Sequence, residues 1–298
     1  MMLLLPGCGG TASVGASPRE GVAFTDALGN KLAIHAPKRV VALMGSFAQT
    51  WLLAGGELVG VTDDAFDERG LDLPEGIASL GAYNSPNVES IIALNPDLVL
   101  LSSETQAHVA LQAVLKDAGI PAAYFSVTHF DDYFQMLKVC TDITGRADLY
   151  ETNGAAVGRQ IDAVLADAQG RAGPTVAFLI TYSGGVVVND SSSMTGKMLS
   201  DLGCKNIADE APSLLKEFSM ESLIAADPDY IFVVPMGNDD ALAMKNLQES
   251  IEANPAWNGL SAVKNGRYIL LPKEQFLYKP NAEWGESYAY LSSILYGG

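Results

Sequence analysis

The sequence contains an internal duplication that strongly restricts its possible folds. The segment 87–100 matches the segment 219–232: each copy has a polar residue, a glutamate two positions later, a short apolar pattern, Pro-Asp and an apolar run. A polar residue followed by an acidic first turn begins a helix, and proline disfavours helical backbone at the residue before it. Each copy therefore predicts a capped short helix and then a buried strand, one such unit in each half of the chain.

Apolar runs and helical patterns alternate throughout the chain. Since 298 residues exceed what one hydrophobic core usually serves, two cores are expected. Runs that are apolar on both faces and separated by helices indicate parallel sheets covered by helices. After a hairpin at 22–34, we predict strands at 39–44, 58–63, 97–102, 122–127, 175–181, 230–235 and 268–271, and helices at 47–54, 88–94, 106–118, 195–202, 240–253 and 283–296.

A longer helix is predicted between the two halves. Apolar residues recur at helical spacing from Leu149 to Ala168, with Asp148 as the cap and Gly170 near the stop. Such a helix spans about 30 Å and resists bending, so we expect little hinge movement. The fold class is α/β, with two βαβ-type lobes of mostly parallel sheet joined by a rigid helix; the predicted segments are 1–21 (anchor and tether), 22–146 (N-terminal lobe), 147–171 (linker helix) and 172–298 (C-terminal lobe).

The first residues resemble the end of a secretory signal. Three leucines precede Gly7 and Cys8, which is the order in which a lipid-accepting cysteine follows an apolar run. No Lys or Arg precedes the leucines, so we hypothesise a start codon farther upstream, which N-terminal mass spectrometry would test. A flexible tether from Gly9 to Gly21 follows. The alternative is an irregular start with an inert Cys8.

Composition excludes some classes of partner. Acidic residues outnumber basic ones 35 to 18, so the basic surface that holds a nucleic-acid backbone is absent. No apolar run is long enough to span a bilayer, so membrane attachment is expected through a lipid anchor only. Cys140 and Cys204 have apolar neighbours and no metal-ligand spacing, which favours buried thiols over a disulfide.

The duplicated segment, in its order with other pieces, resembles a known family. Its pattern Asn-x-Glu-x-(Ile/Leu)-x-x-Leu-x-Pro-Asp before an apolar strand is similar to that of substrate-binding proteins for iron-siderophore, haem and cobalamin ABC importers. The resemblance covers about residues 40–296 and includes 39–43 leading to Ser46, 80–83 and 202–207. It implies that Glu89 and Glu221 dock on arginines of a permease dimer with ATPase subunits, and that the protein is a monomer. The alternative for both glutamates is simple pairing with a helix dipole.

Ligands of open α/β sheets bind beyond the carboxyl ends of the strands, which places the site between the lobes. No Arg follows a strand there and only Lys279 does, which favours a neutral, aromatic or corrinoid ligand over an anionic siderophore. For the aromatic and methionine candidates the alternative is a core position. The predicted ligand-binding residues are Ser46, Phe47, Tyr83, Asn84, Tyr182, Ser183, Met236 and Tyr278.

An iron porphyrin needs an axial ligand, for which Tyr, His or Met can serve. The histidines are too far apart in sequence to favour a bare zinc or manganese ion, so we expect no intrinsic metal or cofactor. The conceivable axial residues are His108, His129, Tyr83, Tyr182 and Met236.

The chain has no dinucleotide fingerprint, nucleophile elbow or metalloprotease motif, so we expect no catalysis. We therefore predict an extracytoplasmic binding lipoprotein that captures an iron complex (siderophore or haem) or a cobalamin-type corrinoid as cargo and delivers it to a permease. Alternatives are a two-lobed enzyme, such as a metal chelatase or glycosyl transferase, and a surface adhesin.

Overall fold

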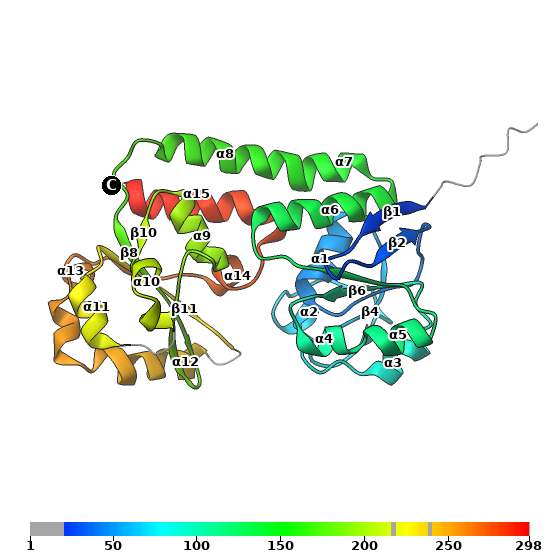
Figure 1. Ribbon diagram of the computed structural model, residues 1–298, viewed down its shortest axis with the longest axis horizontal. Helices are drawn as coiled ribbons and strands as arrows, with labels where there is room; N and C mark the ends of the chain where they lie inside the picture. Colours follow the sequence, from blue (N-terminus) through cyan, green and yellow to red (C-terminus); the bar gives the residue numbers. More distant parts are fainter. Residues whose placement is uncertain (1–20, 216–218, 238–239, 298) are drawn as a thin grey trace, which may run out of the picture.

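The computed structural model describes residues 21–215, 219–237 and 240–297. Cys8, the predicted lipid-accepting residue, lies outside the described residues. Two α/β lobes lie side by side below a layer of long helices (Figure 1). The predicted fold class is confirmed, and the domain boundaries stay a prediction.

The first lobe contains a five-stranded parallel sheet in the order β5-β4-β3-β6-β7. The chain runs outward in one direction from β3 and then in the other from β6, so β3 and β6 flank the switch point of the topology. Both strands are buried along their whole length, as their apolar sequences require. The strands are β3 (Val40–Ala42), β4 (Leu58–Val61), β5 (Ala78–Ser79), β6 (Leu98–Ser102) and β7 (Ala122–Phe125).

Short helices follow most of these strands, and an antiparallel hairpin precedes them. The predicted single helix at 106–118 is instead two helices that meet at Leu111. The elements are β1 (Val22–Thr25), β2 (Lys31–Ile34), α1 (Gly45–Leu53), α2 (Asp64–Asp67), α3 (Val88–Ala93), α4 (Gln106–Ala110) and α5 (Gln112–Asp117).

The second lobe repeats the parallel arrangement with one difference. Its strands follow the order β10-β8-β11-β12, and β9 pairs antiparallel with β8. Strand β9 was not predicted; it begins at Gly185, immediately after a two-residue turn. The strands are β8 (Thr175–Tyr182), β9 (Gly185–Asn189), β10 (Lys205–Asn206), β11 (Tyr230–Pro235) and β12 (Tyr268–Leu270).

Helices surround the second sheet as well. The longer ones are α9 (Met194–Asp201), α11 (Met220–Ala226), α12 (Asp240–Leu247) and α15 (Trp284–Tyr296). The shorter ones are α10 (Ile207–Glu210), α13 (Ser261–Lys264) and α14 (Lys273–Phe276), with 3-10 turns at Pro212–Leu215, Pro255–Gly259 and Asn281–Glu283 and a π turn at Gln248–Glu252.

A layer of long helices joins the lobes. The chain leaves the first lobe through α6 (Phe130–Thr144), then runs as one helical rod through α7 (Ala147–Tyr150), a π turn (Glu151–Ala155) and α8 (Ala156–Ala168). The C-terminal helix α15 packs along α8 (Figure 1). The linker is therefore not a lone helix, because α6 and α15 lie in the same layer.

The cap of the linker rod lies two residues before its predicted position. Arg146, not Asp148, is the residue before the first turn, and the two side chains form a bidentate ion pair at 2.7–2.8 Å. The prediction of Asp148 as the cap is wrong, because its carboxylate is engaged by the guanidinium.

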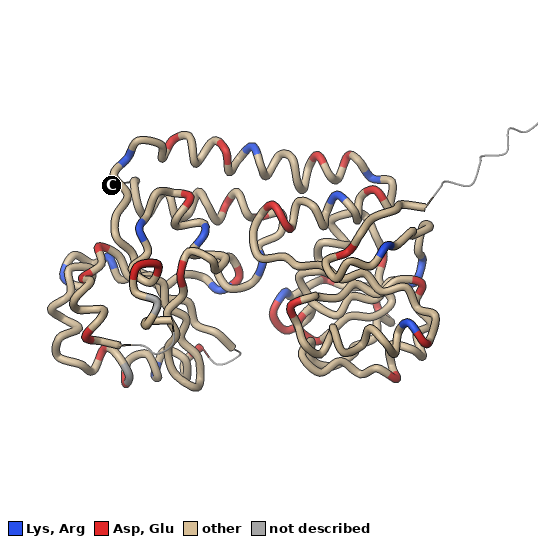
Figure 2. The backbone as a smooth tube through the Cα atoms, in the orientation of Figure 1, with Lys and Arg blue, Asp and Glu red and all other residues tan. Residues whose placement is uncertain are grey.

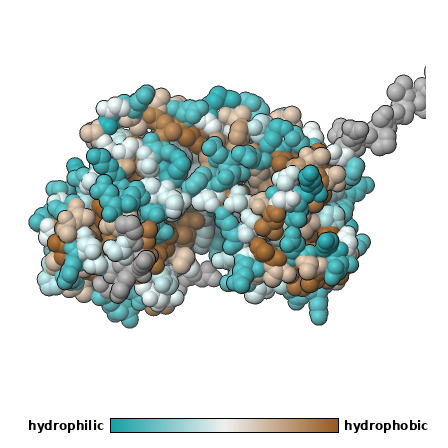
Figure 3. Space-filling model, in the orientation of Figure 1, coloured by the Kyte–Doolittle hydropathy of each residue, from teal (hydrophilic) through white to brown (hydrophobic). Residues whose placement is uncertain are grey.

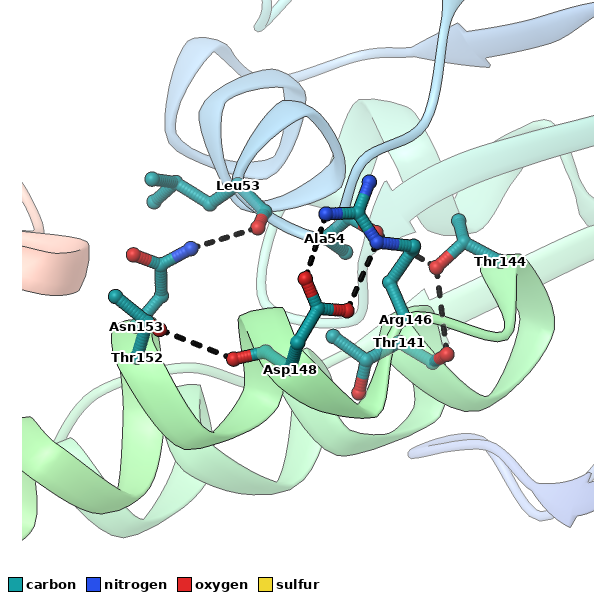
Figure 4. A network of polar contacts seen from close by, with 8 residues as sticks. All are labelled: Leu53, Ala54, Thr141, Thr144, Arg146, Asp148, Thr152 and Asn153. Carbon is teal, nitrogen blue, oxygen red and sulfur yellow. Dashed lines mark hydrogen bonds and ion pairs between the residues drawn. The ribbon is translucent and has the colours of Figure 1, made fainter.

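One side chain at the end of α6 and one in the rod bind the end of α1 in the first lobe (Figure 4). Asn153 Nδ2 donates to the carbonyl oxygen of Leu53 at 2.8 Å, and Thr144 Oγ1 donates to that of Ala54 at 2.6 Å. Carbonyl groups at a helix end have no partner within their helix. The linker region thus satisfies the last carbonyls of α1 and fixes its own position on the first lobe.

Other predictions concern the cysteines, the membrane and charge. Cys140 and Cys204 are buried and free, as expected, and burial raises the pKa of each thiol to about 12.

In the described part of the chain, every helix is too short or too polar to span a bilayer. In the view of Figure 2, Lys and Arg residues are scattered over both lobes.

Candidate ligand-binding site

A cavity of about 400 Å³ lies between the lobes. Figure 3 shows the surface hollowed between the lower parts of the two lobes, with hydrophobic residues on both sides. In the first lobe the cavity borders the segments that follow β3 and β4, near the switch point of the sheet. The lining residues are Met44, Ser46, Asp64, Glu68, Arg69 and Tyr83 from the first lobe and Met236, Gly237, Leu277, Tyr278 and Lys279 from the second half of the chain.

Asp64 fixes the turn from β3 into α1. Its Oδ2 accepts the backbone N–H of Gly45 at 2.6 Å, and its Oδ1 accepts the hydroxyl of Thr62 at 2.6 Å. A side chain at position 45 would come within 2.8 Å of the Ala65 backbone nitrogen, so glycine is required there. Both carboxylate oxygens are occupied, which makes Asp64 a positioning residue for the wall of the cavity.

Ser46 presents a polar group without a partner. Its hydroxyl is buried, lines the cavity and makes no hydrogen bond among the described residues. Buried polar atoms are nearly always hydrogen-bonded in folded proteins, so an exception at a cavity wall calls for an explanation. A turn of this side chain toward the cavity would bring the hydroxyl within reach of a ligand oxygen or nitrogen.

Two cationic side chains lie in the cavity wall. Arg69 Nη2 donates to the carbonyl oxygen of Lys279, a contact between the first lobe and the segment that precedes α15. Burial lowers the pKa of Arg69 to about 10 and also lowers that of Lys279. The expectation that no arginine reaches the cleft is wrong, because Arg69 is brought there by the turn after α2 and not by the end of a strand.

Two further ionisable groups border these cations. Burial, and then the nearby Asp64, raises the pKa of Glu68. Burial, with Glu68 next in effect, raises the pKa of Tyr278 to about 12, so its hydroxyl is protonated at neutral pH. The cavity wall thus combines two cations, the Glu68 carboxyl and a phenol donor with two methionines.

The structure brings together four of the eight predicted ligand residues. Ser46, Tyr83, Met236 and Tyr278 all line the cavity. Sequence reasoning missed Asp64, Glu68 and Arg69, although the Thr-Asp-Asp run after β4 marks the carboxyl end of a strand and was a usable signal.

The other four predicted residues do not line the cavity. Phe47 is only 1% exposed and packs edge-on against Phe125 in the core, because the first turn of α1 directs it inward. Asn84 is exposed beside Tyr83. Tyr182 ends β8 and Ser183 begins the turn into β9, and the carbonyl groups of both residues accept from the Asn246 amide. Neither residue lines the cavity.

His108, a conceivable iron ligand, has a structural role instead. It is fully buried, its Nδ1 accepts the N–H of Ser102 at 3.0 Å, and its Nε2 lies 2.7 Å from the Tyr83 carbonyl oxygen. Both ring nitrogens are occupied, so the ring holds the Tyr83 loop in place. His129 lies at a different cavity, between α6 and α8, and the described residues contain no cluster of three metal-binding side chains.

Glu89 and Glu221 lie in the first turns of α3 and α11, one in each lobe, and both are exposed. The described residues show no hydrogen bond or ion pair to either carboxylate. Both are therefore available to a partner.

The sequence and the fold can be compared with known proteins. The putative ABC transporter substrate-binding lipoprotein YhfQ of Bacillus subtilis is 25% identical over 89% of this chain and 85% of its own. The Fe(3+)-citrate-binding protein YfmC of the same organism is 24% identical over 89% and 84%. The structure of the iron uptake substrate-binding protein PiuA of Streptococcus pneumoniae superposes with a TM-score of 0.73 at 20% identity, over 94% of this chain and 99% of that chain.

The two-lobed fold is thus shared with binding proteins of this kind. The sequence profile of one family, described as "Periplasmic binding protein", matches residues 40–275, which include most of both lobes and the whole linker rod. The chain belongs to the periplasmic binding protein family.

Proposed function

We propose that this protein is the extracytoplasmic substrate-binding component of an ABC importer and that it captures an iron complex between its lobes. The observation that carries the proposal is the inter-lobe cavity, where Arg69 and Lys279 lie beside Tyr83, Tyr278 and Met236. Concave sites with apolar walls and a few convergent polar groups are typical of small-molecule binding. Ferric citrate and siderophore binding by relatives supports the same choice of cargo.

The chemistry of the cavity favours a compact anionic chelate. Two cations suit carboxylate or phenolate oxygens around ferric iron, and the protonated Tyr278 hydroxyl adds a donor. The volume is near the lower end of the roughly 300–1,000 Å³ typical of ligand sites, which favours ferric citrate or a small siderophore over a whole corrinoid. Haem and cobalamin remain the comparison ligands, since relatives bind each of them.

Docking and anchoring complete the proposal. Glu89 and Glu221 meet basic residues of a permease dimer that works with ATPase subunits, Cys8 carries a lipid that holds the protein at the membrane, and the protein is a monomer. Reversing both glutamate charges should abolish transport without changing ligand affinity, because paired charges across an interface chiefly guide orientation and encounter. Unchanged transport by the double variant would remove the docking role.

A thermal-shift and absorbance screen tests ligand capture. The purified protein is titrated with ferric citrate, a panel of ferric siderophores, haem and cobalamin. A ligand that binds only the folded state stabilises it by about 2.7 kcal/mol at 100 times its Kd, which gives a clear rise in Tm. We expect such a rise with an anionic ferric chelate. No rise with any class would favour the two-lobed enzyme or the surface adhesin, and turnover of a porphyrin or sugar donor would identify the enzyme.

A further inference from the structure

The two copies of the duplicated segment begin with the same intramolecular contact. Asn87 Oδ1 accepts the backbone N–H of Ser90 at 3.0 Å, and Ser219 Oγ accepts that of Ser222 at 3.2 Å. These bonds satisfy N–H groups in the first turns of α3 and α11. The fold therefore accounts for the polar residue that opens each copy.

The ends of the two helices are also equivalent. Asn95 and Asp227 both have positive φ, 45° and 39°. Two residues later, the carboxylate of Asp97 accepts a backbone N–H just before β3 at 2.9 Å, and that of Asp229 accepts the first N–H of β8 at 2.8 Å. The fold thus accounts for the end of each copy as well.

An acidic and an apolar residue remain exposed in the middle of each copy. Glu89 is followed three residues later by Ile92, and Glu221 by Ile224, so each pair lies on one face of its helix. The two isoleucines are 40% and 41% exposed, whereas the apolar residue just before each is at most 1% exposed. The preceding residue in each copy packs into the core. The fold therefore does not require an apolar side chain at position 92 or 224.

One exposed isoleucine on a surface needs no explanation. Here the same acid and isoleucine pair recurs at equivalent positions of both lobes, with neither glutamate bonded among the described residues. In Figure 1, α3 and α11 both lie below the layer of long helices, one in each lobe. Two equivalent patches fit a partner with two equivalent surfaces, as a symmetric dimer has.

We infer that Ile92 and Ile224 are apolar anchors for the permease dimer, each entering an apolar recess beside the basic group that meets Glu89 or Glu221. This inference rests on the proposed function. Apolar contacts at the centre of an interface supply affinity, whereas charges mainly steer the encounter. A second copy of this chain is a poor occupant, because it would bring glutamate against glutamate at a net charge of −17 on each chain.

Sedimentation with membrane vesicles tests the inference without any cargo. The full-length chain with Cys8→Ala, which prevents lipidation, is added to right-side-out vesicles from source cells that lack the native gene. The double variant Ile92→Ser/Ile224→Ser should bind about 10-fold more weakly than the parent protein, while Ile92→Leu/Ile224→Leu should stay within about 3-fold. The salt dependence should persist in the serine variant and weaken in Glu89→Gln/Glu221→Gln, because only the latter removes charge.

Two exposed valines provide matched controls. Val114 on α5 and Val187 on β9 are 41% and 39% exposed, and Val114→Ser/Val187→Ser should bind like the parent. Parent-like binding by the isoleucine-to-serine variant, or an equal loss in the valine control, would overturn the inference. Absence of any saturable binding by the parent would overturn it together with the docking role, whereas the ligand screen judges cargo capture separately.

Discussion

The side-chain amide of Asn281 donates a hydrogen bond to the carbonyl oxygen of Ser46 at 3.0 Å and another to Gln49 Oε1 at 2.8 Å. Asn281 is 1% exposed and has a φ of 54°. It precedes α15, which packs along α8, yet it contacts α1 of the first lobe. The wall of the ligand cavity at Ser46 is thus held by a residue from the far end of the chain.

Replacing Asn281 should destabilise the protein. Asn281→Ala removes both hydrogen bonds and places alanine, which disfavours positive φ, at this position. We therefore expect the free energy of unfolding, measured by urea titration, to fall by about 2–3 kcal/mol. Asn281→Gly loses the same bonds but tolerates the backbone, so it should be less destabilised by about 1 kcal/mol. Wild-type stability of the alanine variant would show that these bonds contribute nothing.

The stability of the protein should depend on pH through His108. Burial lowers the pKa of His108 in the folded state. The unfolded state therefore takes up the proton first, and stability is lost as the pH falls below about 6.5, by up to about 1.4 kcal/mol per pH unit. Urea titrations at about pH 7.5 and about pH 5.5 measure this loss.

The control for this effect is His108→Gln, which has no titratable ring. Its stability should change less between the two pH values than that of the wild type, although it is lower at both because of the lost contact to Tyr83. An unchanged pH dependence would assign the loss to other groups.

The ammonium group of Lys279 should select anionic cargo. Lys279→Met keeps the length of the side chain and removes the charge, so affinity for ferric citrate should fall about 10-fold, equivalent to about 1.4 kcal/mol, with little effect on a neutral ligand. Calorimetric titration measures both. Lys273→Met, which removes a cation paired with Asp240 and not in the cavity lining, is the matched control. Equal losses in the two variants would point to general electrostatics.

The contact between Asn153 and Leu53 should contribute to the stability of the first lobe. Asn153→Ala leaves a carbonyl at the end of α1 without its donor, and we expect a loss of about 1–2 kcal/mol in the free energy of unfolding. Thr152→Ala removes only an exposed bond within the same rod and should cost less than about 0.5 kcal/mol. Similar values for both variants would argue against a specific role of Asn153.

The sequence by itself determined the features that depend on near neighbours. The duplicated segment predicted α3 with β6 and α11 with β11, and their caps at Asn87 and Ser219 are present. Apolar periodicity placed most of the strands, including β11 at its observed bounds. The same signal was present but unused in α6, where Tyr133, Met136, Leu137 and Cys140 are buried at helical spacing.

Only the tertiary structure decided which side chains meet. Arg69 and Lys279 are far apart in sequence and come together because the lobes pack around the segment before α15. Tyr182 ends β8, where it pairs with β9 and does not line the cavity, and Phe47 points into the core. Local patterns indicate which residues of one helix or strand are buried. A binding site depends instead on long-range packing between elements, which no short stretch of sequence encodes.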